Sequence, residues 1–581
     1  MIDPLEPKLP QNDPMRAHRA RTLEDARETY KYTYQWPPGV ATAKEVPSSD
    51  TYSLGYIAGI TPSAVQLFEN TVALGGYLVK EHELRTLAAR ERASMGELSG
   101  PAAGAWYLRL PARLASYVRD EPVRSVDVYS TLHQTLEAPA VQSRWDDDDV
   151  FAWQRIAGVN PMTLRRVASL PDYVAISEAD VARSKALTTT LARAIGEGTV
   201  FACDYTLLAG ARTGKTNNRR KWLPAPYALF AAVGGKLRPI AIQLAKGASS
   251  AVCVPGDGQR WTIARLAVQV ADANVHETIE HLGRTHMVME AVTLAMKRQL
   301  ASEHPLRKLL EPHTEFTLAI NHSAATNLIA PDGVVDQAFA GAIDASASLV
   351  RFALDTFDLR RSVPTKALVD RGLDDRAVLS ELPYRDDALD VFAVIERFAR
   401  KYVAIYYPSA NEIREDDELR AFVEELTDDA GGRLSGVGAV DTPESLAEVL
   451  AAILWTATAQ HAAVNFPQYP YMGALPNMAG AFWSQWPPTD LDESGLIEKL
   501  MPPYNMAMAQ VYTVLQLSSL RLTRLGEFGP AQFLHGPARE LVASFAKELE
   551  QLDADLRARD ATRFLPYPFL FPSNIPGSIH I

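Results

Sequence analysis

The stretch from about Trp261 to Ala301 constrains the fold more than any other part of the chain. Its apolar periodicity can form one helix of roughly thirty residues or more, whereas the usual helix of a globular protein has about 10–14. A break near Asp272-Ala273-Asn274 is the alternative. Because a helix this long usually crosses the centre of a large core, we predict a mainly α protein with long central helices.

Three of the twelve histidines of the chain lie in the middle of this stretch, at His276, His281 and His286. Residues five apart lie roughly 140° apart around an ideal α-helix, so His281 and His286 converge only if the helix widens locally. Such π-type widening is found mostly at functional sites. His276 and Glu277 allow a second interpretation, because His-Glu-x-x-x-His is one residue longer than the zinc-peptidase motif.

A second helix is predicted to be buried, because residues 449–465 are apolar on every side. It carries His461 and Asn465, which lie four residues apart and therefore on one face. Buried polar side chains need partners, and a hydrogen-bonded core histidine is the simplest explanation. If the two helices instead cross at their histidine faces, they supply three imidazoles and an amide oxygen. This set without sulfur suits iron or manganese better than structural zinc.

Composition limits the remaining functions. The net charge of −12 argues against a nucleic-acid partner, and two cysteines are too few for a disulfide framework or a thiolate metal site. The first residues lack the pattern of a signal peptide, and we find no run of about 18 apolar residues that predicts a membrane span. We expect a cytoplasmic or peripheral membrane protein. The apolar residues 54–60 form either a helix that covers the core or a membrane-docking segment.

Two regions are expected along the chain. Residues 1–50 are polar and dotted with proline, which is typical of an extended N-terminal arm, and residues 51–581 form one large helical domain. Within this domain, residues 199–205 and 237–244 have the β-branched pattern of strands, with Gly234-Gly235 as the turn before the second. We therefore predict a small antiparallel β-sheet as an accessory to the helices.

Several motifs together resemble the lipoxygenase family, in its compact bacterial type without the N-terminal β-sandwich (PLAT/C2-like) domain. The resemblance covers roughly residues 50–581. It depends on the order and spacing of four segments: His281-Leu282-Gly283-Arg284-Thr285-His286, residues 304–313, residues 461–471, and Ser578-Ile579-His580-Ile581.

The resemblance implies a site with one non-haem iron per chain; manganese is less favoured because the chain ends in Ile rather than Val. The implied ligands are His281, His286, His461, Asn465 and the terminal carboxylate of Ile581. Glu277 and Gln468 occupy the positions of residues that support the ligands. The implied reaction adds O2 to a polyunsaturated fatty acid with a cis,cis-1,4-pentadiene, such as linoleate or arachidonate. A ferric hydroxide takes the bis-allylic hydrogen, and a fatty-acid hydroperoxide is formed. A monomer is expected.

The resemblance also implies substrate-pocket residues: Ala273, Ala324, Leu328, Ala338 and Phe339. Three alternatives remain open. A hydroperoxide isomerase on the same fold would use the same ligands. A zinc peptidase would use His276, Glu277 and His281, and a non-catalytic lipid-binding protein would need no metal.

Overall fold

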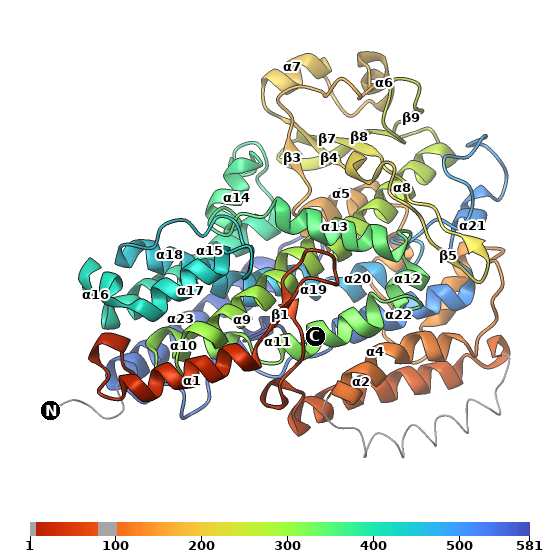
Figure 1. Ribbon diagram of the computed structural model, residues 1–581. Coiled ribbons are helices and arrows are strands. Elements are labelled where there is room, and N and C mark those ends of the chain that lie inside the picture. Colours follow the sequence, from red (N-terminus) through yellow and green to blue (C-terminus); the bar gives the residue numbers. More distant parts are fainter. Residues whose placement is uncertain (1–6, 79–100) are drawn as a thin grey trace.

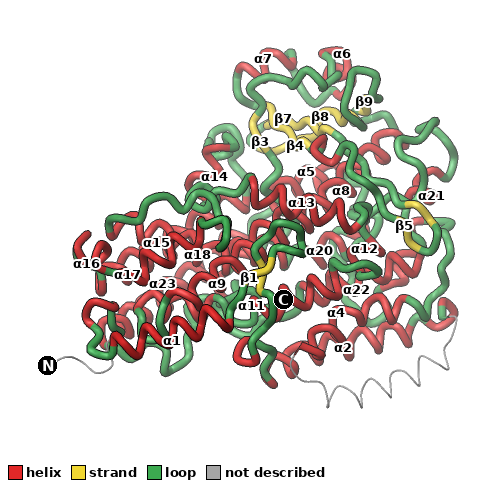
Figure 2. The backbone as a smooth tube through the Cα atoms, in the orientation of Figure 1, coloured by secondary structure: helices red, strands yellow, loops and turns green. Residues whose placement is uncertain are grey.

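Helices make up most of the protein, and a small β-sheet lies at one end (Figure 1). The structure is a computed structural model that describes residues 7–78 and 101–581. Figure 2, in which the backbone is coloured by secondary structure, also shows that helices predominate. The prediction of a mainly α fold with a small antiparallel sheet is confirmed.

The long central helix runs without a break through three segments. It comprises α8 (Gln259–Val275), the π-helical η7 (His276–Met287) and α9 (Val288–Gln299). The helix begins after Gly258 at φ +60° and ends where Leu300 becomes extended. The predicted length and the predicted widening between His281 and His286 are both confirmed. The break considered near Asp272 does not occur.

A second central helix comprises α18 (Pro443–Trp455), the π-helical η10 (Thr456–Gln460) and α19 (His461–Asn465). The segment from Pro443 to Met472 is long and apolar enough to cross a membrane, but 94% of its most apolar window is buried inside the protein. It therefore behaves as a core helix. We found no such run in the sequence because scattered charged and polar residues interrupt the apolar ones.

The five-stranded sheet has the order β3-β4-β7-β8-β9, and all of its pairs are antiparallel. Its strands are β3 (Arg165–Arg166), β4 (Val200–Asp204), β7 (Tyr227–Val233), β8 (Lys236–Gln243) and β9 (Val252–Cys253). The predicted turn joins β7 to β8, with Gly234 and Gly235 both at positive φ, as two-residue hairpins require. β4 and β8 correspond to the predicted strands. β7 had not been predicted as a separate strand.

The first fifty residues differ from the predicted extended arm, because α1 (Arg16–Thr29) and the short strands β1 (Tyr32–Thr33) and β2 (Thr42–Ala43) lie within them. The buried Arg19 of α1 forms an ion pair with Glu418. Such contacts with distant residues fix the segment on the helical body. The division of the chain at residue 50 stays a prediction.

The other helices surround the two central ones (Figure 1). Those before the central helix are α2 (Leu54–Ala73), α4 (Pro101–Ala115), α5 (Asp148–Ala157), α6 (Glu178–Ser184) and α7 (Leu191–Gly196). Those between the central helices are α10 (Pro305–Leu310), α11 (Thr317–Ser323), the π-helical η9 (Ala324–Leu328), α12 (Val334–Ala338), α13 (Ile343–Asp355), α14 (Pro364–Asp370), α15 (Pro383–Tyr406), α16 (Ala410–Glu415) and α17 (Asp417–Thr427). Those after them are α20 (Gln468–Met472), α21 (Leu496–Leu500), α22 (Tyr504–Leu517) and α23 (Gly536–Asp560).

A buried ion pair connects α5 to the central helix. Arg155 donates from Nη1 to Oδ2 of Asp272 at 2.7 Å, and both side chains are at most 1% exposed. The other oxygen of Asp272 accepts hydrogen bonds from the hydroxyl of Tyr205 at 2.9 Å and from the amide of Asn160 at 2.8 Å. All the oxygens of this buried carboxylate are therefore satisfied, which fixes the helix just before η7.

Candidate metal centre

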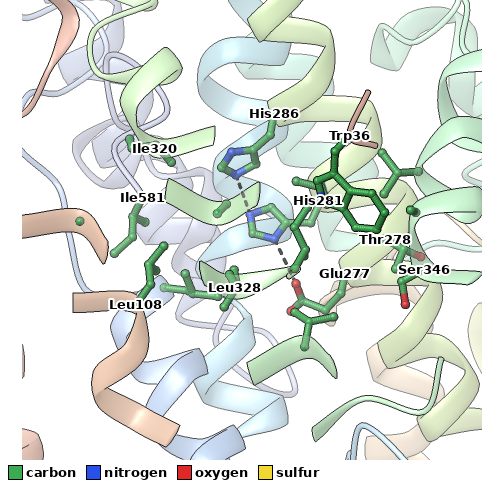
Figure 3. A pocket seen from close by; sticks show the side chains of 18 of the residues that line it. Trp36, Leu108, Glu277, Thr278, His281, His286, Ile320, Leu328, Ser346 and Ile581 are labelled. Atoms are coloured by element: carbon green, nitrogen blue, oxygen red, sulfur yellow. Dashed lines mark hydrogen bonds and ion pairs between the residues drawn. The ribbon is translucent and has the colours of Figure 1, made fainter. Parts of the chain in front are cut away.

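Three histidines from the two central helices come together in the core. His281 and His286 project from η7, and His461 is the first residue of α19. Their ligating nitrogens lie within 4.8 Å of one another, and all three side chains are buried. The Nε2 atoms of His281 and His286 are 3.3 Å apart (Figure 3). Three imidazole nitrogens that converge in this way can hold one metal ion.

The π-helical backbone explains why histidines five residues apart converge. Hydrogen bonds from residue i to i+5 widen the turn, so His281 and His286 lie on the same side of the helix. Gly283, between them, lets α13 approach closely, because a Cβ atom at this position would collide with the Cβ of Ala353.

Burial keeps the three imidazoles neutral. It lowers the pKa of His286 to about 3, with a further contribution from His281, and it lowers the pKa of His461 well below the ordinary value. The pKa of His281 is lowered for the same reason, although Glu277 partly opposes the effect. Neutral imidazoles are the form that binds metals.

The surroundings of His461 give the strongest indication that a metal ion binds at this group of histidines. His461 is 1% exposed, and neither of its ring nitrogens makes a hydrogen bond of normal geometry with the described residues, although the backbone of Ile581 lies close to the ring. Buried polar atoms are nearly always paired, so an unpaired imidazole beside two others fits a metal site.

Asn321 of α11 orients His286. Its Oδ1 lies 2.8 Å from Nδ1 of His286, and its Nδ2 donates to the main-chain oxygen of His286 at 2.9 Å and to Oε2 of Glu290 at 3.0 Å. The other oxygen of Glu290 accepts from the backbone N–H of Ala43 at 2.7 Å. We had not predicted a role for Asn321 or Glu290. The sequence did contain an indication for Glu290, because it is an ionisable residue four positions after His286 in an otherwise apolar stretch.

Replacing Asn321 with alanine should lower metal content or turnover about 10–100-fold, the usual effect of losing a side chain that orients a ligand. Metal analysis and kcat measured on the same preparation test this. Asn70→Ala is a matched control, because Asn70 is also buried but donates to the carbonyl of Leu132, away from the histidines. Equal metal loss in both variants would contradict the role of Asn321.

His276 lies outside the group of three. Its Nε2 is 2.7 Å from the carbonyl oxygen of Val464, and its Nδ1 is 3.5 Å from Oε1 of Glu277. Oε2 of Glu277 lies 3.4 Å from Nδ1 of His281. Burial alone would raise the pKa of Glu277, but the two imidazoles lower it to about 2. Because its ring nitrogens face these partners, His276 is a neighbour of the site, and the zinc-peptidase arrangement is disfavoured.

Asn465 and Gln468 lie one after the other beyond His461. Asn465 donates from Nδ2 to the carbonyl of Leu517 at 2.7 Å, and its Oδ1 accepts from Nε2 of Gln468 at 2.9 Å. The backbone of Ile581 lies close to the ring of His461. This contact raises the pKa of His461 and so opposes the effect of burial, which lowers it. The predicted supporting contact of Gln468 with Asn465 is therefore present, and Ile581 lies beside the histidines.

An apolar cavity reaches the histidines. It is lined by Trp36, Tyr52, Tyr56, Gly104, Tyr107, Leu108, Glu277, Thr278, His281, Leu282, His286, Ile320, Ala324, Leu328, Ile329, Val335, Ile343, Ser346, Ala347, Val350, Leu517 and Ile581. Figure 3 shows His281 and His286 between Trp36 on one side and Ile320 and Ile581 on the other. An apolar chain could therefore lie directly against the imidazoles.

Two of the five predicted pocket residues line this cavity, Ala324 and Leu328, both on η9. Ala273, Ala338 and Phe339 are buried but are not among its lining residues. Their predicted effect on pocket depth stays a prediction. Trp36 had not been predicted, because it comes from the N-terminal segment, to which no pocket role was assigned.

The fold and site define a class of helical proteins with a buried, sulfur-free group of side chains that can hold a metal ion beside an apolar cavity. The sequence model of the lipoxygenase family matches residues 129–519. The chain thus belongs to the lipoxygenase family, a family of fatty-acid dioxygenases that also includes hydroperoxide isomerases.

Individual relatives of the chain support its assignment to the lipoxygenase family. The linoleate 9/13-lipoxygenase of Pseudomonas aeruginosa is 31% identical over an alignment that covers 99% of this chain and 93% of that protein. The hydroperoxide isomerase ALOXE3 of Rattus norvegicus is 32% identical, over 81% of this chain and 66% of that protein. A solved structure of a LOX deletion variant in complex with arachidonate has a TM-score of 0.86 at 24% identity, over 99% of this chain and 83% of that one.

Proposed function

We propose that the protein is a non-haem iron dioxygenase that adds O2 to polyunsaturated fatty acids containing a cis,cis-1,4-pentadiene. The observation that carries the proposal is the group formed by His281, His286 and His461 at the wall of an apolar cavity. A metal buried in this way meets an apolar chain with little water present, which favours oxidation of a carbon–hydrogen bond in the chain.

The proposed iron ligands are His281, His286, His461, Asn465 and the carboxylate of Ile581. The unpaired nitrogens of His461 and the absence of sulfur from this set fit iron. When bound, the iron supplies the one-electron oxidation that removes the bis-allylic hydrogen. Manganese accepts the same donors, and metal analysis distinguishes the two.

The protein side chains orient the ligands and position the substrate. Asn321 and Glu277 fix the rings of His286 and His281, and Gln468 holds the amide oxygen of Asn465. The cavity wall excludes water, and it aligns the chain by contact with side chains such as Leu328. No side chain has to act as a general base, in keeping with a reaction in which the metal does the chemistry.

The names of the relatives support the substrate class. A linoleate lipoxygenase is similar over nearly the whole chain, and an arachidonate complex has the same fold. Hydroperoxide isomerases are also among the relatives, and this observation favours hydroperoxide isomerisation as the second candidate function. The same histidine group would serve both reactions.

The test is a kinetic comparison of iron-loaded protein under air. With linoleate, we expect O2 uptake and conjugated-diene absorbance to rise in equal amounts. Faster consumption of linoleate hydroperoxide than of linoleate, without O2 uptake, would identify the isomerase instead. If neither substrate reacts in protein shown to contain iron, both functions are wrong.

Replacing Leu328 with alanine should lower kcat/KM for linoleate about 10–100-fold and change the ratio of hydroperoxide regioisomers. The reason is that loss of an apolar contact of this size changes substrate discrimination by a similar factor. Chromatography of the products measures both effects. Leu426→Ala, in the buried core of α17, should lose stability and keep the product ratio. An unchanged ratio in Leu328→Ala would contradict the proposed contact.

A further inference from the structure

A second cavity lies against the same two central helices and is lined in part by charged and polar side chains. Its wall includes Glu280 and Arg284 of η7, Thr456 and Gln460 of η10, and Arg371 just after α14. None of its lining residues lines the apolar cavity described above. Neither the proposed iron ligands nor the proposed substrate contacts account for it.

Arg371 lines this second cavity, and its side chain gives the main indication of a ligand there. The residue is 6% exposed, and its guanidinium donates from Nη1 to the carbonyl of Pro161 at 2.6 Å and from Nε to the carbonyl of Ala367 at 3.2 Å. Its Nη2 has no partner among the described residues. A buried guanidinium that keeps one donor free at a cavity wall requires an acceptor.

The surrounding charges favour an anion. Arg165 and Arg284 lie close enough to Arg371 to oppose its charge, whereas Tyr384 and Glu280 support it. Glu280 accepts from Nη1 of Arg284 at 2.6 Å, while the buried Nε of Arg284 has no partner among the described residues. This part of the wall therefore holds three guanidiniums and one carboxylate.

The rest of the wall reduces this excess of positive charge but does not remove it. Arg361 forms an ion pair with Asp370, and Asp358 accepts from the backbone N–H of Arg361 at 2.9 Å. Counted over all lining residues, arginines still outnumber carboxylates by one. The local excess of two around Arg371 matches a dianion.

We propose that the cavity around Arg371, Arg284 and Arg165 is a binding site for a phosphate group, either free phosphate or a small phosphate monoester. Guanidinium groups bind phosphate oxygens through paired, charge-assisted hydrogen bonds. A phosphate monoester carries close to two negative charges at pH 7, which fits the local excess. The site does not depend on the proposed dioxygenase activity.

The test measures the thermal unfolding midpoint of the iron-loaded, full-length protein during titration with inorganic phosphate, with chloride at equal ionic strength as reference. A second titration uses glycerol phosphate against glycerol. A saturable rise in Tm with either phosphate, absent with chloride and glycerol, is expected. A tighter response to glycerol phosphate identifies the monoester as ligand, and an equal or weaker response identifies free phosphate.

Two variants connect the response to the site. Arg165→Ala removes an exposed side chain and should fold normally, and Arg371→Lys keeps the charge but loses the forked donor. Each should weaken phosphate binding about tenfold or more, the usual effect of losing one charge-assisted hydrogen bond. Arg193→Ala, on the exposed face of α7, is the control and should bind as the wild type does. No saturable rise in the wild type, or undiminished binding in both site variants, would overturn the proposal.

Discussion

Replacing His461 with alanine should remove most of the bound iron and lower oxygenation of linoleate by more than about 100-fold. Loss of a side chain that only orients a ligand costs about 10–100-fold, so loss of the ligand itself should exceed that range. His461 is the one histidine of the three that comes from the second central helix. Without it, His281 and His286 supply two nitrogens from one side only.

The readouts are iron content per chain, diene absorbance and the unfolding midpoint. His322→Ala is the control, because His322 lies on α11 and is only partly buried. It should keep both iron and activity. A His461→Ala protein that is folded, contains iron at the wild-type level and produces diene at the wild-type rate would contradict the assignment.

Replacing Asp272 with alanine should lower the free energy of unfolding by about 3–5 kcal/mol. Removing one partner of a buried ion pair leaves the other charge uncompensated in the core. Here Arg155 would lose its carboxylate, and its Nε already has no partner among the described residues. The hydroxyl of Tyr205 and the amide of Asn160 would lose an acceptor as well.

The shift of the urea midpoint measures this effect. Asp492→Ala is the matched control, because Asp492 pairs with Arg260 where both side chains are at least half exposed. Exposed pairs contribute about 0–1 kcal/mol, so this variant should unfold close to the wild type. Equal shifts in the two variants would show that the buried pair does not hold α5 against α8.

Part of the candidate metal centre was predictable from local spacing, whereas the complete ligand set was implied only by the family resemblance. The spacing of five residues from His281 to His286 required a widened helix, and the structure has π-helical backbone there. The spacing of four residues from His461 to Asn465 placed both side chains on one face of a buried helix, and both lie in the core. The crossing of the two helices, which brings the three histidines together, depends on tertiary packing and could not be predicted from spacing.

Contacts between distant segments could not be predicted in the same way. Asn321 reaches His286 from α11, and Glu290 accepts from Ala43 in the N-terminal segment. That segment was predicted as an extended arm from its prolines, yet α1 is held on the body by the ion pair of Arg19 with Glu418. No periodicity in the sequence encodes these partners.

The residues that line the cavity were also only partly predictable from the sequence. Ala324 and Leu328 of η9 line it, whereas Ala338 and Phe339 are buried but are not among its lining residues. Cavity depth depends on how neighbouring side chains fill the core, which spacing along the chain does not determine. Trp36 lines the cavity although it is more than two hundred residues from the histidines in sequence.

The most direct test of the account is anomalous diffraction from crystals of iron-supplied protein, with data collected on both sides of the iron and zinc absorption edges. We predict one iron peak between the ring nitrogens of His281, His286 and His461, with the backbone of Ile581 next to it. A zinc peak between His276 and His281, or no metal peak among the three histidines, would contradict the account.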